Sequence, residues 1–396
     1  MPHRIKHIAH FDLDSFFVSV ERLFNPDLSK SDDRGNMPPV VVGGSADKRG
    51  VVASASYEAR AYGVRSAMPM KTALRLCPHL IIVKGRHGTY SEISSKILVR
   101  LHDFAPVIEQ TSIDEGYMDL TGCEKLFNND FYSTLKMLQN LVDKEFHLPI
   151  SFGMGSTRII AKIASGKAKP KGILIVEPGQ EKSFLGNLEI DEIPGIGLKT
   201  AEKLKQRGFI EVSQLQELSE YTLTQILGKY GEALFKIIHA KSSNTLTPDH
   251  ERKSISSEET FSEDLPPGTE FQNLFAPHIE EICHRLRKIG KKARTVHIKI
   301  RYKDFSTVTR SHSLRATNDD ALVSKTVMSL FNNAYNFETE VRLIGVGLSN
   351  FVDSAESMEL FQTQSSKRET LLQTVDSIRE KHGFDVIKVR GIKKKD

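Results

Sequence analysis

Three carboxylates stand out near the expected ends of strands, and two of them break the pattern of their strand. Asp114 and Glu115 are adjacent in the segment IEQTSIDEGYMDLT, whereas a half-buried strand alternates apolar and polar side chains. Asp12 lies in the segment HFDLDSFF, on an expected strand where Leu13 points into the core. Neighbouring like charges cost free energy unless a positive charge lies between them. We therefore expect the three acids to converge on one positive charge at the ends of their strands.

A pair of Mg²⁺ ions is the positive charge that this set of acids predicts. Mg²⁺ takes hard oxygen ligands and substrate phosphates, and two such ions about 4 Å apart can stabilise the attacking and leaving oxygens of a phosphoryl transfer. Adjacent residues of a regular strand face opposite ways, so we expect a hairpin turn, eased by Gly116, to bring Asp114 and Glu115 to one side. Asp14 shares the expected strand face of Asp12, but Asp14 and Ser15 are also placed to cap the helix that follows.

Two further segments carry groups that suit phosphate oxygens. Tyr57 and Arg60 are three residues apart in ASYEARAYG, so they would share one face of a helix. The forked guanidinium matches phosphate geometry, although a surface Arg beside a half-buried Tyr is the alternative. Lys169 lies in the loop-like segment GKAKPKGI, where a following Pro and Gly would hold it on a constrained backbone.

A glycine-rich turn in IPGIGLKTA is the first candidate DNA contact. Gly195 and Gly197 would expose backbone N–H groups at a helix N-terminus, beside Lys199. Such a helix-hairpin-helix turn suits one DNA phosphate. The alternative is a tight glycine turn that binds no ligand.

A basic segment is the second candidate DNA contact. From Arg285 to Arg315 the chain has eleven Lys and Arg residues and a single acid, Asp304. Such a run can be a solvated face, but basic residues interleaved with strand-forming ones are typical of a sheet that binds nucleic-acid backbone. The residues expected to contact DNA are Lys291, Lys292, Arg294, Lys299, Arg301 and Arg310.

Length and composition bound the class of protein. A chain of 396 residues exceeds one ordinary core, so we expect about two to four domains. It is 39% hydrophobic and 27% charged, as in soluble globular proteins. No apolar run approaches the roughly 20 residues that cross a bilayer, and the first residues lack the apolar core of a signal peptide. Cys77, Cys123 and Cys283 form no C-x-x-C pair and are expected to be reduced thiols of a cytoplasmic protein.

The first half of the chain alternates between strand-like and helix-like segments. We expect strands at 5–14, 39–44, 149–155 and within 50–64 and 107–121, and helices at 15–24, 90–104, 131–146 and 157–167. This alternation predicts an α/β domain built on a mainly antiparallel sheet.

From about residue 177 the sequence indicates short helices, followed at 241–254 by the polar composition of a linker. Beyond the linker we expect elements at 255–261, 271–289, 294–302, 306–312, 319–336 and 340–350. Their order, βαββαβ, matches a small ferredoxin-like domain. Residues 352–396 are interpreted as a polar tail with one amphipathic stretch that includes Leu371, Val375 and Ile378.

Taken together, these motifs resemble those of the Y-family DNA polymerases, and specifically the DNA polymerase IV group. The shared segments are, in order, D-x-D-x-F-F, Y-E-A-R-x-x-G-V-R-S-A-M-P, S-I-D-E, A-K-I-A-S-x-K-A-K-P-x-G and I-P-G-I-G, over roughly residues 5–350. The resemblance implies an α/β multi-domain (α+β) fold, the right-hand polymerase. Its parts would be a palm at 1–14 and 86–176, fingers at 15–85, a helical thumb at 177–240, a linker at 241–252, a little finger at 253–351 and a C-terminal tail at 352–396.

The resemblance also assigns roles to residues. The metal-binding and catalytic set comprises Asp12, Asp114, Glu115 and the backbone carbonyl of Leu13, with two Mg²⁺ ions per active site. The residues that contact the dNTP are Phe16, Phe17, Tyr57, Arg60 and Lys169. Among these, Phe17 falls at the position of the steric gate that excludes ribose. Asp14 matches a position that binds no metal, which favours the helix-cap interpretation.

The implied activity is template-directed DNA synthesis at low fidelity, without a proofreading exonuclease, for lesion bypass in DNA repair and damage tolerance. The implied partners are primer-template DNA, dNTPs and the replication sliding clamp, with no membrane, and the protein is expected to be a monomer. The segment SMELF (357–361) ends like a clamp-binding pentapeptide but lacks its initial Gln. Two alternatives remain open: a deoxycytidyl transferase-like branch of the same family, and a non-catalytic DNA-binding repair scaffold.

Overall fold

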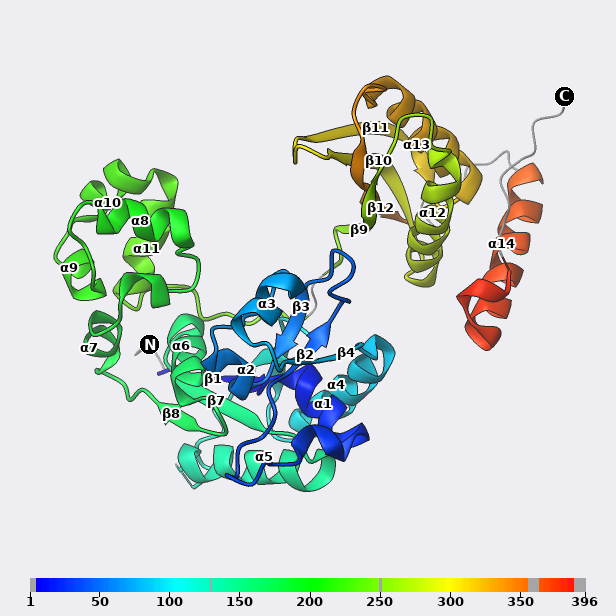
Figure 1. Cartoon of the computed structure of the whole chain (residues 1–396). Coiled ribbons are helices and arrows are strands. Elements are labelled where there is room, and N and C mark those ends of the chain that lie inside the picture. The colour runs from blue at the N-terminus through cyan, green and yellow to red at the C-terminus, as the bar shows by residue number, and fades with distance from the viewer. Residues whose placement is uncertain (1–4, 129, 249–250, 355–362, 388–396) are drawn as a thin grey trace, which may run out of the picture. The chain divides into compact units, whose positions relative to one another are not determined.

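The computed structural model describes residues 5–128, 130–248, 251–354 and 363–387, which form two compact units, Met1–His250 and Glu251–Asp396 (Figure 1). Helices and sheets are combined in both units, so the predicted α/β multi-domain class is confirmed. Among the described residues, no helix is both long and apolar enough to cross a membrane.

A five-stranded sheet is the centre of the first unit, with the strand order β5-β6-β1-β7-β8. All neighbouring strands are antiparallel except β7 and β8, so the prediction of a mainly antiparallel sheet is confirmed. The sequence did not indicate the short last strand. The strands are β1 (Ile8–Leu13), β5 (Val107–Gln110), β6 (Glu115–Asp119), β7 (Ile150–Gly155) and β8 (Ile173–Ile175).

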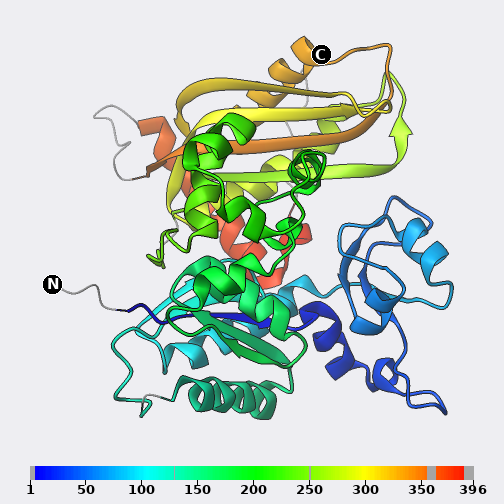
Figure 2. The same ribbon diagram turned by 90° about the vertical axis from the view of Figure 1, so that its left-hand side faces the viewer.

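The two faces of this sheet have different surroundings because side chains of a strand alternate. On β1, Ala9, Phe11 and Leu13 point into the main core, which they share with α4 (His87–His102) and α5 (Phe131–Phe146). Helix α5 runs along this face in both ribbon views (Figures 1 and 2). His10 and Asp12 point to the opposite face.

Helix α6 (Arg158–Ala168) covers that opposite face and lies very close to β7. A Cβ atom added to Gly153 would lie 2.0 Å from the backbone nitrogen of Ser165 and 2.2 Å from the carbonyl oxygen of Ala161. Only a glycine permits this approach. The close contact therefore fixes the point from which α6 directs its side chains over the sheet.

A smaller three-stranded sheet has its own core and follows the first strand and helix of the chain. The elements are α1 (Phe16–Phe24), β2 (Val40–Gly43), β3 (Val52–Ala55), α2 (Tyr57–Ala61), α3 (Met70–Leu76) and β4 (Ile81–Val83). The strand order is β3-β2-β4, with β2 and β4 parallel. The core contains mostly small and β-branched residues of these strands and helices.

Short helices follow β8, as the sequence predicted. They are α7 (Glu181–Gly186), α8 (Leu198–Lys205), α9 (Val212–Gln216), α10 (Glu220–Leu227) and α11 (Lys229–Ile238). Their buried Leu, Ile and Val side chains form one apolar cluster.

Part of the expected linker is packed against the five-stranded sheet. The backbone N–H of Thr247 donates to the buried carboxylate of Glu109 (2.8 Å), and Arg158 donates to the carbonyl of Thr245 (3.3 Å). Leu246 is buried in a small cluster with residues of β1 and β6. The chain thus remains attached to the sheet until at least Thr247.

The second unit contains a four-stranded antiparallel sheet with the order β11-β10-β12-β9, whose core includes side chains of two helices. The elements are β9 (Ser254–Leu265), α12 (Phe271–Lys288), β10 (Lys291–Tyr302), β11 (Thr307–Thr317), α13 (Asp320–Ala334) and β12 (Val341–Asp353). This sequence confirms the predicted βαββαβ order.

The tail contains a helix that packs on this unit, α14 (Thr363–His382). The carboxylate of Asp376 accepts from Arg287 Nε (2.6 Å) and pairs with His284 Nδ1 (2.9 Å), both on α12. Leu372 is buried, whereas the predicted Leu371 is 59% exposed. The predicted amphipathic face is therefore right at Val375, which is buried, but wrong at Leu371.

The reason for this error is a buried arginine. Arg379 is only 3% exposed and pairs with Glu280 of α12. The buried face of α14 follows 372, 375 and 379, with helical spacing. A pattern search that counts only apolar residues does not recognise this face.

Candidate active site

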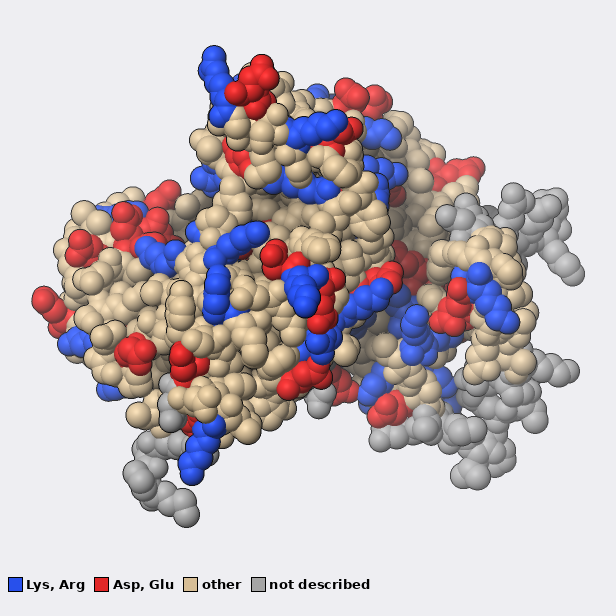
Figure 3. Space-filling model, turned by 90° about the horizontal axis from the view of Figure 1, so that it is seen from below, with Lys and Arg blue, Asp and Glu red and all other residues tan. Residues whose placement is uncertain are grey.

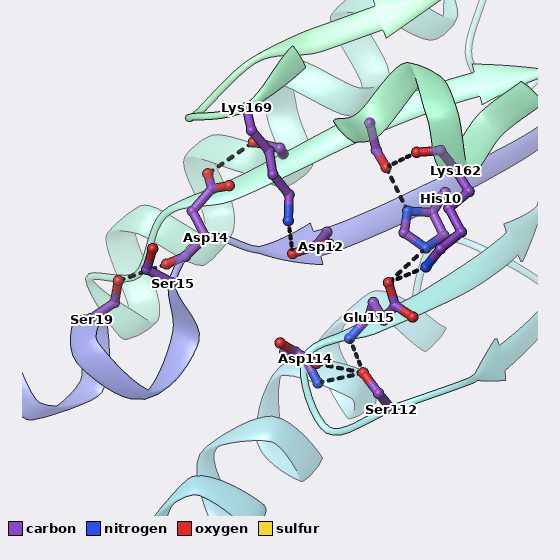
Figure 4. A network of polar contacts seen from close by, with 12 residues as sticks. His10, Asp12, Asp14, Ser15, Ser19, Ser112, Asp114, Glu115, Lys162 and Lys169 are labelled. Carbon is purple, nitrogen blue, oxygen red and sulfur yellow. Dashed lines mark hydrogen bonds and ion pairs between the residues drawn. The ribbon is translucent and has the colours of Figure 1, made fainter. Parts of the chain in front are cut away.

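Asp12 and Glu115 lie directly opposite each other on the antiparallel strands β1 and β6. Opposite residues of such a pair have their side chains on the same face, about 4.5–5.5 Å apart at Cβ, and like charges there are destabilising. The structure therefore brings together two of the three acids that the sequence singled out (Figure 4).

Asp114 lies beside this pair, in the turn between β5 and β6. The Ser112 hydroxyl donates to the Asp114 carboxylate and accepts from the backbone N–H of Glu115 (3.2 Å). The N–H of Leu13 donates to the carbonyl of Asp114 (2.9 Å), which ties the turn to the end of β1. The turn thus allows the two adjacent acids to leave the alternating pattern.

Gly116 does not ease this turn, so that part of the prediction was wrong. It lies within β6 opposite Phe11, and its φ is outside the left-handed region. A Cβ atom here would lie 2.6 Å from Phe11 Cζ and 2.7 Å from the carbonyl oxygen of Glu109. The glycine makes room for an aromatic ring, and Ser112 organises the turn.

Two lysines supply the positive charge between the acids in this structure. Lys169 Nζ lies 2.5 Å from Asp12 Oδ1, and Lys162 Nζ pairs with Glu115 Oε2 (Figure 4). Burial raises the pKa of Asp12 to about 6, against the effect of Lys169 and with the help of Asp114 and Glu115. The His10 ring and the Lys162 ammonium lower the pKa of Glu115 to about 2 despite its burial. Burial therefore outweighs the neighbouring lysine at Asp12, whereas the partners of Glu115 outweigh its burial.

His10 is a buried neighbour of Glu115 that the sequence interpretation did not single out. Its Nδ1 lies 2.7 Å from the Ser165 hydroxyl, and its Nε2 lies 3.4 Å from Glu115. Burial lowers the pKa of the His10 ring below its ordinary value of 6.5. Its place two residues before Asp12, on the same strand face, was the available sequence signal.

Asp14 is a buried junction, and the helix-cap prediction for it was wrong. Strand β1 ends at Leu13, so Asp14 no longer shares the strand face of Asp12. Its carboxylate accepts from the Tyr57 hydroxyl (3.0 Å), the Ser151 hydroxyl (2.8 Å) and the backbone N–H of Lys171 (2.8 Å). These contacts join α2, β7 and the loop after α6 at one point.

The predicted pair on α2 shares one face, as its spacing indicated. The Arg60 guanidinium lies over the Tyr57 ring, 5.0 Å from its centroid, and Arg60 Nε donates to the Ala55 carbonyl (3.0 Å). Ser56 caps this helix by accepting from the N–H of Ala59 (3.2 Å). Burial and the neighbouring Asp14 raise the pKa of Tyr57, which keeps its hydroxyl protonated as a donor.

The two aromatic residues at the start of α1 have different surroundings. Phe16 is only 2% exposed, so its side chain belongs to the core and only its backbone can face a ligand. Phe17 is half-buried, and its ring is stacked on Tyr90 with centroids 4.4 Å apart and an interplanar angle of 12°. The Tyr90 hydroxyl donates to the buried carboxylate of Glu21 (2.6 Å), which holds the ring beneath Phe17.

The glycine-rich turn lies where the sequence placed it, before α8. Gly195 has a φ of 97°, which strongly favours glycine, and Gly197 is the N-cap of the helix. Lys199 is an exposed residue of the first helical turn.

The basic residues of the second unit do not all lie on one face. Lys299 and Arg301 alternate with buried Ile298 and Ile300, so they lie on the sheet face away from the core. Arg310 pairs with Ile298 across β10 and β11 and thus lies on the other face, at an exposed edge. The prediction of one basic face was wrong for Arg310, because the register between strands is not visible in the sequence.

Several of these cations have acidic partners. Lys299 pairs with Glu258 of β9 (2.7 Å), and Lys291 pairs with Glu251 (2.8 Å) and Asp353 (2.9 Å). The other two candidates, Lys292 and Arg294, lie at the start of β10. Lys and Arg are also interspersed with Asp and Glu on the face of the molecule in Figure 3. The segment SMELF (357–361) lies outside the described residues.

The residues at the sheet end fit a divalent cation by their chemistry. Asp12, Asp114, Glu115 and the Leu13 carbonyl provide only oxygen donors, which hard cations prefer. Burial, more than the neighbouring acids, raises the pKa of Asp12, so a bound cation would favour its ionised form. Within the described ranges, however, there is no assembled cluster of three or more His, Cys, Asp and Glu side chains suited to a metal.

Comparison with family profiles covers most of the chain in three segments. Residues 11–166 match the impB/mucB/samB family, and residues 252–360 match the impB/mucB/samB family C-terminal domain. Residues 191–239 match the thumb domain of DNA polymerase-iota.

Individual proteins are similar over almost the whole chain. A DNA polymerase IV of Dehalococcoides mccartyi (strain CBDB1) is 37% identical over 385 residues, covering 97% of this chain and 96% of the relative. A DNA polymerase IV of Treponema denticola (strain ATCC 35405) is 35% identical over 391 residues, covering 98% and 97%. A solved Y-family DNA polymerase chimera, Dbh-Dpo4(243-245)-Dbh, superposes with a TM-score of 0.75 at 26% identity and covers 88% of this chain and 99% of its own. An insertion ternary complex of Dbh DNA polymerase gives a TM-score of 0.62 with the same identity and coverage.

Proposed function

The chain belongs to the Y family of DNA polymerases, the impB/mucB/samB family, in the group of DNA polymerase IV, and from this premise we propose how its side chains carry out DNA synthesis. It is a DNA-directed DNA polymerase of the translesion type, and its role is in DNA repair. Its partners are DNA and dNTPs, and Y-family polymerases use divalent metal ions. In the proposed reaction the primer 3′-hydroxyl attacks the α-phosphate of a bound dNTP and pyrophosphate leaves.

The observation that carries the proposal is the position of Asp12 directly opposite Glu115 at the end of the central strands. These carboxylates, Asp114 and the Leu13 carbonyl are proposed to hold two Mg²⁺ ions. When bound, the ions stabilise the negative charge that develops on the reacting oxygens. With pKa values of about 6 and about 2, Asp12 and Glu115 are mostly ionised at neutral pH and ready to bind cations.

Tyr57, Arg60 and Lys169 are proposed to bind the triphosphate. The Tyr57 hydroxyl and the guanidinium of Arg60 start from one face of α2, so they can reach neighbouring phosphate oxygens. Arg60 supplies a fork and Lys169 a flexible point charge. The buried junction at Asp14 supports this arrangement, because it joins α2 to the loop that follows Lys169.

Phe17 is proposed to be the steric gate, next to the Phe16 backbone in the nucleotide site. Its ring is half-buried and rests flat on Tyr90, so it cannot yield easily to an added atom. A sugar packed against this ring would have no space for a 2′-hydroxyl. The residue therefore selects dNTPs over rNTPs.

The remaining segments are proposed to hold DNA. The proposed parts are a palm at 1–14 and 86–176, fingers at 15–85, a thumb at 177–240 and a little finger at 253–351. Gly195 and Gly197 offer backbone N–H groups to a phosphate, and Lys199 stands beside them. The basic residues of β10 add phosphate contacts.

We also propose that the enzyme is a cytoplasmic monomer that docks on a sliding clamp through residues 357–361 or the tail. The support is the sequence SMELF, which ends like a clamp-binding pentapeptide.

Primer extension tests the proposed function. Each dNTP is offered singly with Mg²⁺ on undamaged templates and on templates with a minor-groove adduct. Incorporation that follows the template base on both templates is expected. Incorporation of dCTP opposite every base would indicate the deoxycytidyl transferase-like branch. DNA binding without incorporation would indicate a repair scaffold.

A further inference from the structure

We propose that Lys162 is a resident counter-ion of the active site: it holds Glu115 in the metal-free enzyme and competes with a divalent cation for this carboxylate. The inference rests on the proposed function, since it takes Asp12 and Glu115 to be metal ligands. It assigns a positioning role to a residue outside the predicted site.

The two carboxylates that face each other across β1 and β6 each have one lysine. Lys169 pairs with Asp12 and Lys162 pairs with Glu115. The two lysines come from α6 and its C-cap and are seven residues apart, so both start from one helix face. Without them, two like charges would lie opposite each other on neighbouring strands.

The backbone of Lys162 is fixed while its ammonium group stays partly exposed. The Lys162 carbonyl accepts from the Ser165 hydroxyl (2.9 Å), and that hydroxyl also contacts the buried His10 ring (2.7 Å). The helix is held against the sheet at Gly153. The Lys162 side chain is nevertheless 34% exposed, so its end has space to move. The ammonium is therefore always within reach of Glu115, and its competition with a metal ion is intramolecular.

Lys162 makes the binding of a metal ion to Glu115 less favourable in two ways. The ion pair with Lys162 must open, and the ammonium then remains close to the ion as a like charge. A dNTP reduces both effects, because its phosphates attract the released lysines. Metal and nucleotide are thus expected to strengthen each other's binding. The lysines would keep the empty site from holding divalent ions when no nucleotide is present.

Binding of Mn²⁺ to the metal-free full chain, followed by electron paramagnetic resonance, tests this inference without any turnover. We expect Lys162→Met to bind Mn²⁺ about tenfold more tightly, because a charge within about 4–6 Å changes the affinity of a carboxylate for a proton by about one pK unit or more. Lys162→Arg keeps the charge and should bind like the wild type. Lys167→Met is the matched control, since it removes a lysine of the same helix that pairs with Glu192 instead.

A second readout is the effect of a dNTP. The ratio of Mn²⁺ dissociation constants without and with a dNTP should be smaller in Lys162→Met than in the wild type. Unchanged or weaker Mn²⁺ binding in this variant overturns the inference. If Lys162→Met does not fold, Lys162→Gln removes the same charge with a polar side chain and is compared in the same way.

The proposed function and this inference fail differently. If Asp12→Asn and Glu115→Gln bind Mn²⁺ as well as the wild type does, these carboxylates are not metal ligands and the proposed site is wrong. If both weaken Mn²⁺ binding but neutral variants of Lys162 do not strengthen it, the site stands and only the counter-ion role is wrong.

Discussion

The active site and the tail of the chain both contain paired charges, but different cations hold them. At the active site, lysines pair with Asp12 and Glu115. On the second unit, Arg287 pairs with Asp320 (2.6 Å) and Asp376 (2.6 Å). The Lys162 side chain is 34% exposed, whereas that of Arg287 is 9% exposed.

This difference separates releasable charges from permanent ones. A lysine is a flexible point charge, while an arginine fork is preorganised for carboxylates and can satisfy two of them. Arg287 also donates to the Asn318 carbonyl (2.8 Å), so it joins α12, α14 and the start of α13. We infer that the acids of the active site are held so that they can change partners, and that those around α14 are held to keep the unit folded.

Removal of an active-site acid should have the largest effect on activity. Asp12→Ala or Glu115→Ala is expected to abolish primer extension while primer-template binding remains, because affinity for DNA comes from basic residues elsewhere. The thermal midpoint of the metal-free protein should stay the same or rise in Asp12→Ala, since burial disfavours the charge of that carboxylate. It should fall in Glu115→Ala, since the lowered pKa of Glu115 means that its ionised form stabilises the folded state. A variant that keeps more than about a tenth of the wild-type rate would contradict the two-metal assignment.

Phe17 provides a rigid, uncharged contact for comparison with the releasable charges. Phe17→Ala should keep substantial dNTP incorporation and increase rNTP incorporation by orders of magnitude, measured in single-nucleotide extension. Phe16→Ala is the matched control on the same helix. It should lower the free energy of unfolding by about 3–5 kcal/mol without admitting rNTPs. Equal loss of dNTP and rNTP use in Phe17→Ala would make Phe17 a core residue only.

Removal of the permanent cation should affect stability. Arg287→Met leaves the buried Asp320 without its charge partner and leaves Asp376 paired with His284 alone, which is expected to cost about 3–5 kcal/mol in the free energy of unfolding. Urea denaturation of the full chain should show this loss in the transition of the second unit. Lys288→Met on the same helix removes only an exposed pair with Glu380 and should cost about 1 kcal/mol or less. Similar losses in both variants would remove the distinction between the two kinds of pair.

Lys299 extends the comparison to the DNA-binding surface. Its pair with Glu258 is a releasable contact on the outer sheet face, whereas Arg310 lies on the other face. Lys299→Ala should flatten the dependence of log DNA affinity on log salt by roughly 0.9, the value for one lost phosphate contact. Arg310→Ala should leave the slope unchanged. The reverse result would place DNA on the other face of the sheet.

The smallest effect is expected from the pH dependence of the tail contacts. Burial opposes the ionised form of Asp376, but Arg287 and His284 outweigh it and lower the pKa below the ordinary 3.8. A lowered pKa stabilises the folded state at pH values above 3.8, and this contribution is lost as the pH falls through the folded value. The difference in unfolding free energy between wild type and Asp376→Asn should therefore shrink below pH 3.8. A difference that does not change with pH would exclude a role for this carboxylate's charge.

The sequence predicted the order of elements and the convergence of Asp12 and Glu115, because periodicity and motif spacing report local structure and strand faces. It did not predict contacts that depend on register or on buried polar groups. Asp14 looked like a helix cap, but three donors from distant segments surround it. The separation of seven residues between Lys162 and Lys169 was visible in the sequence. Its meaning depended on the packing of α6 over the sheet, which no local pattern reports.

Gly153 has no functional group, yet it limits how this enzyme can evolve. Any side chain there would push α6 away from β7, since even a Cβ atom would lie 2.0 Å from the helix backbone. Such a shift would also move the backbone of Lys162 and Lys169, and it would disturb the roles of both lysines at once. A mutation at one lysine alters one of these roles, whereas a mutation at Gly153 alters both. Sequence variation at Gly153 is therefore expected to be more restricted than at either lysine.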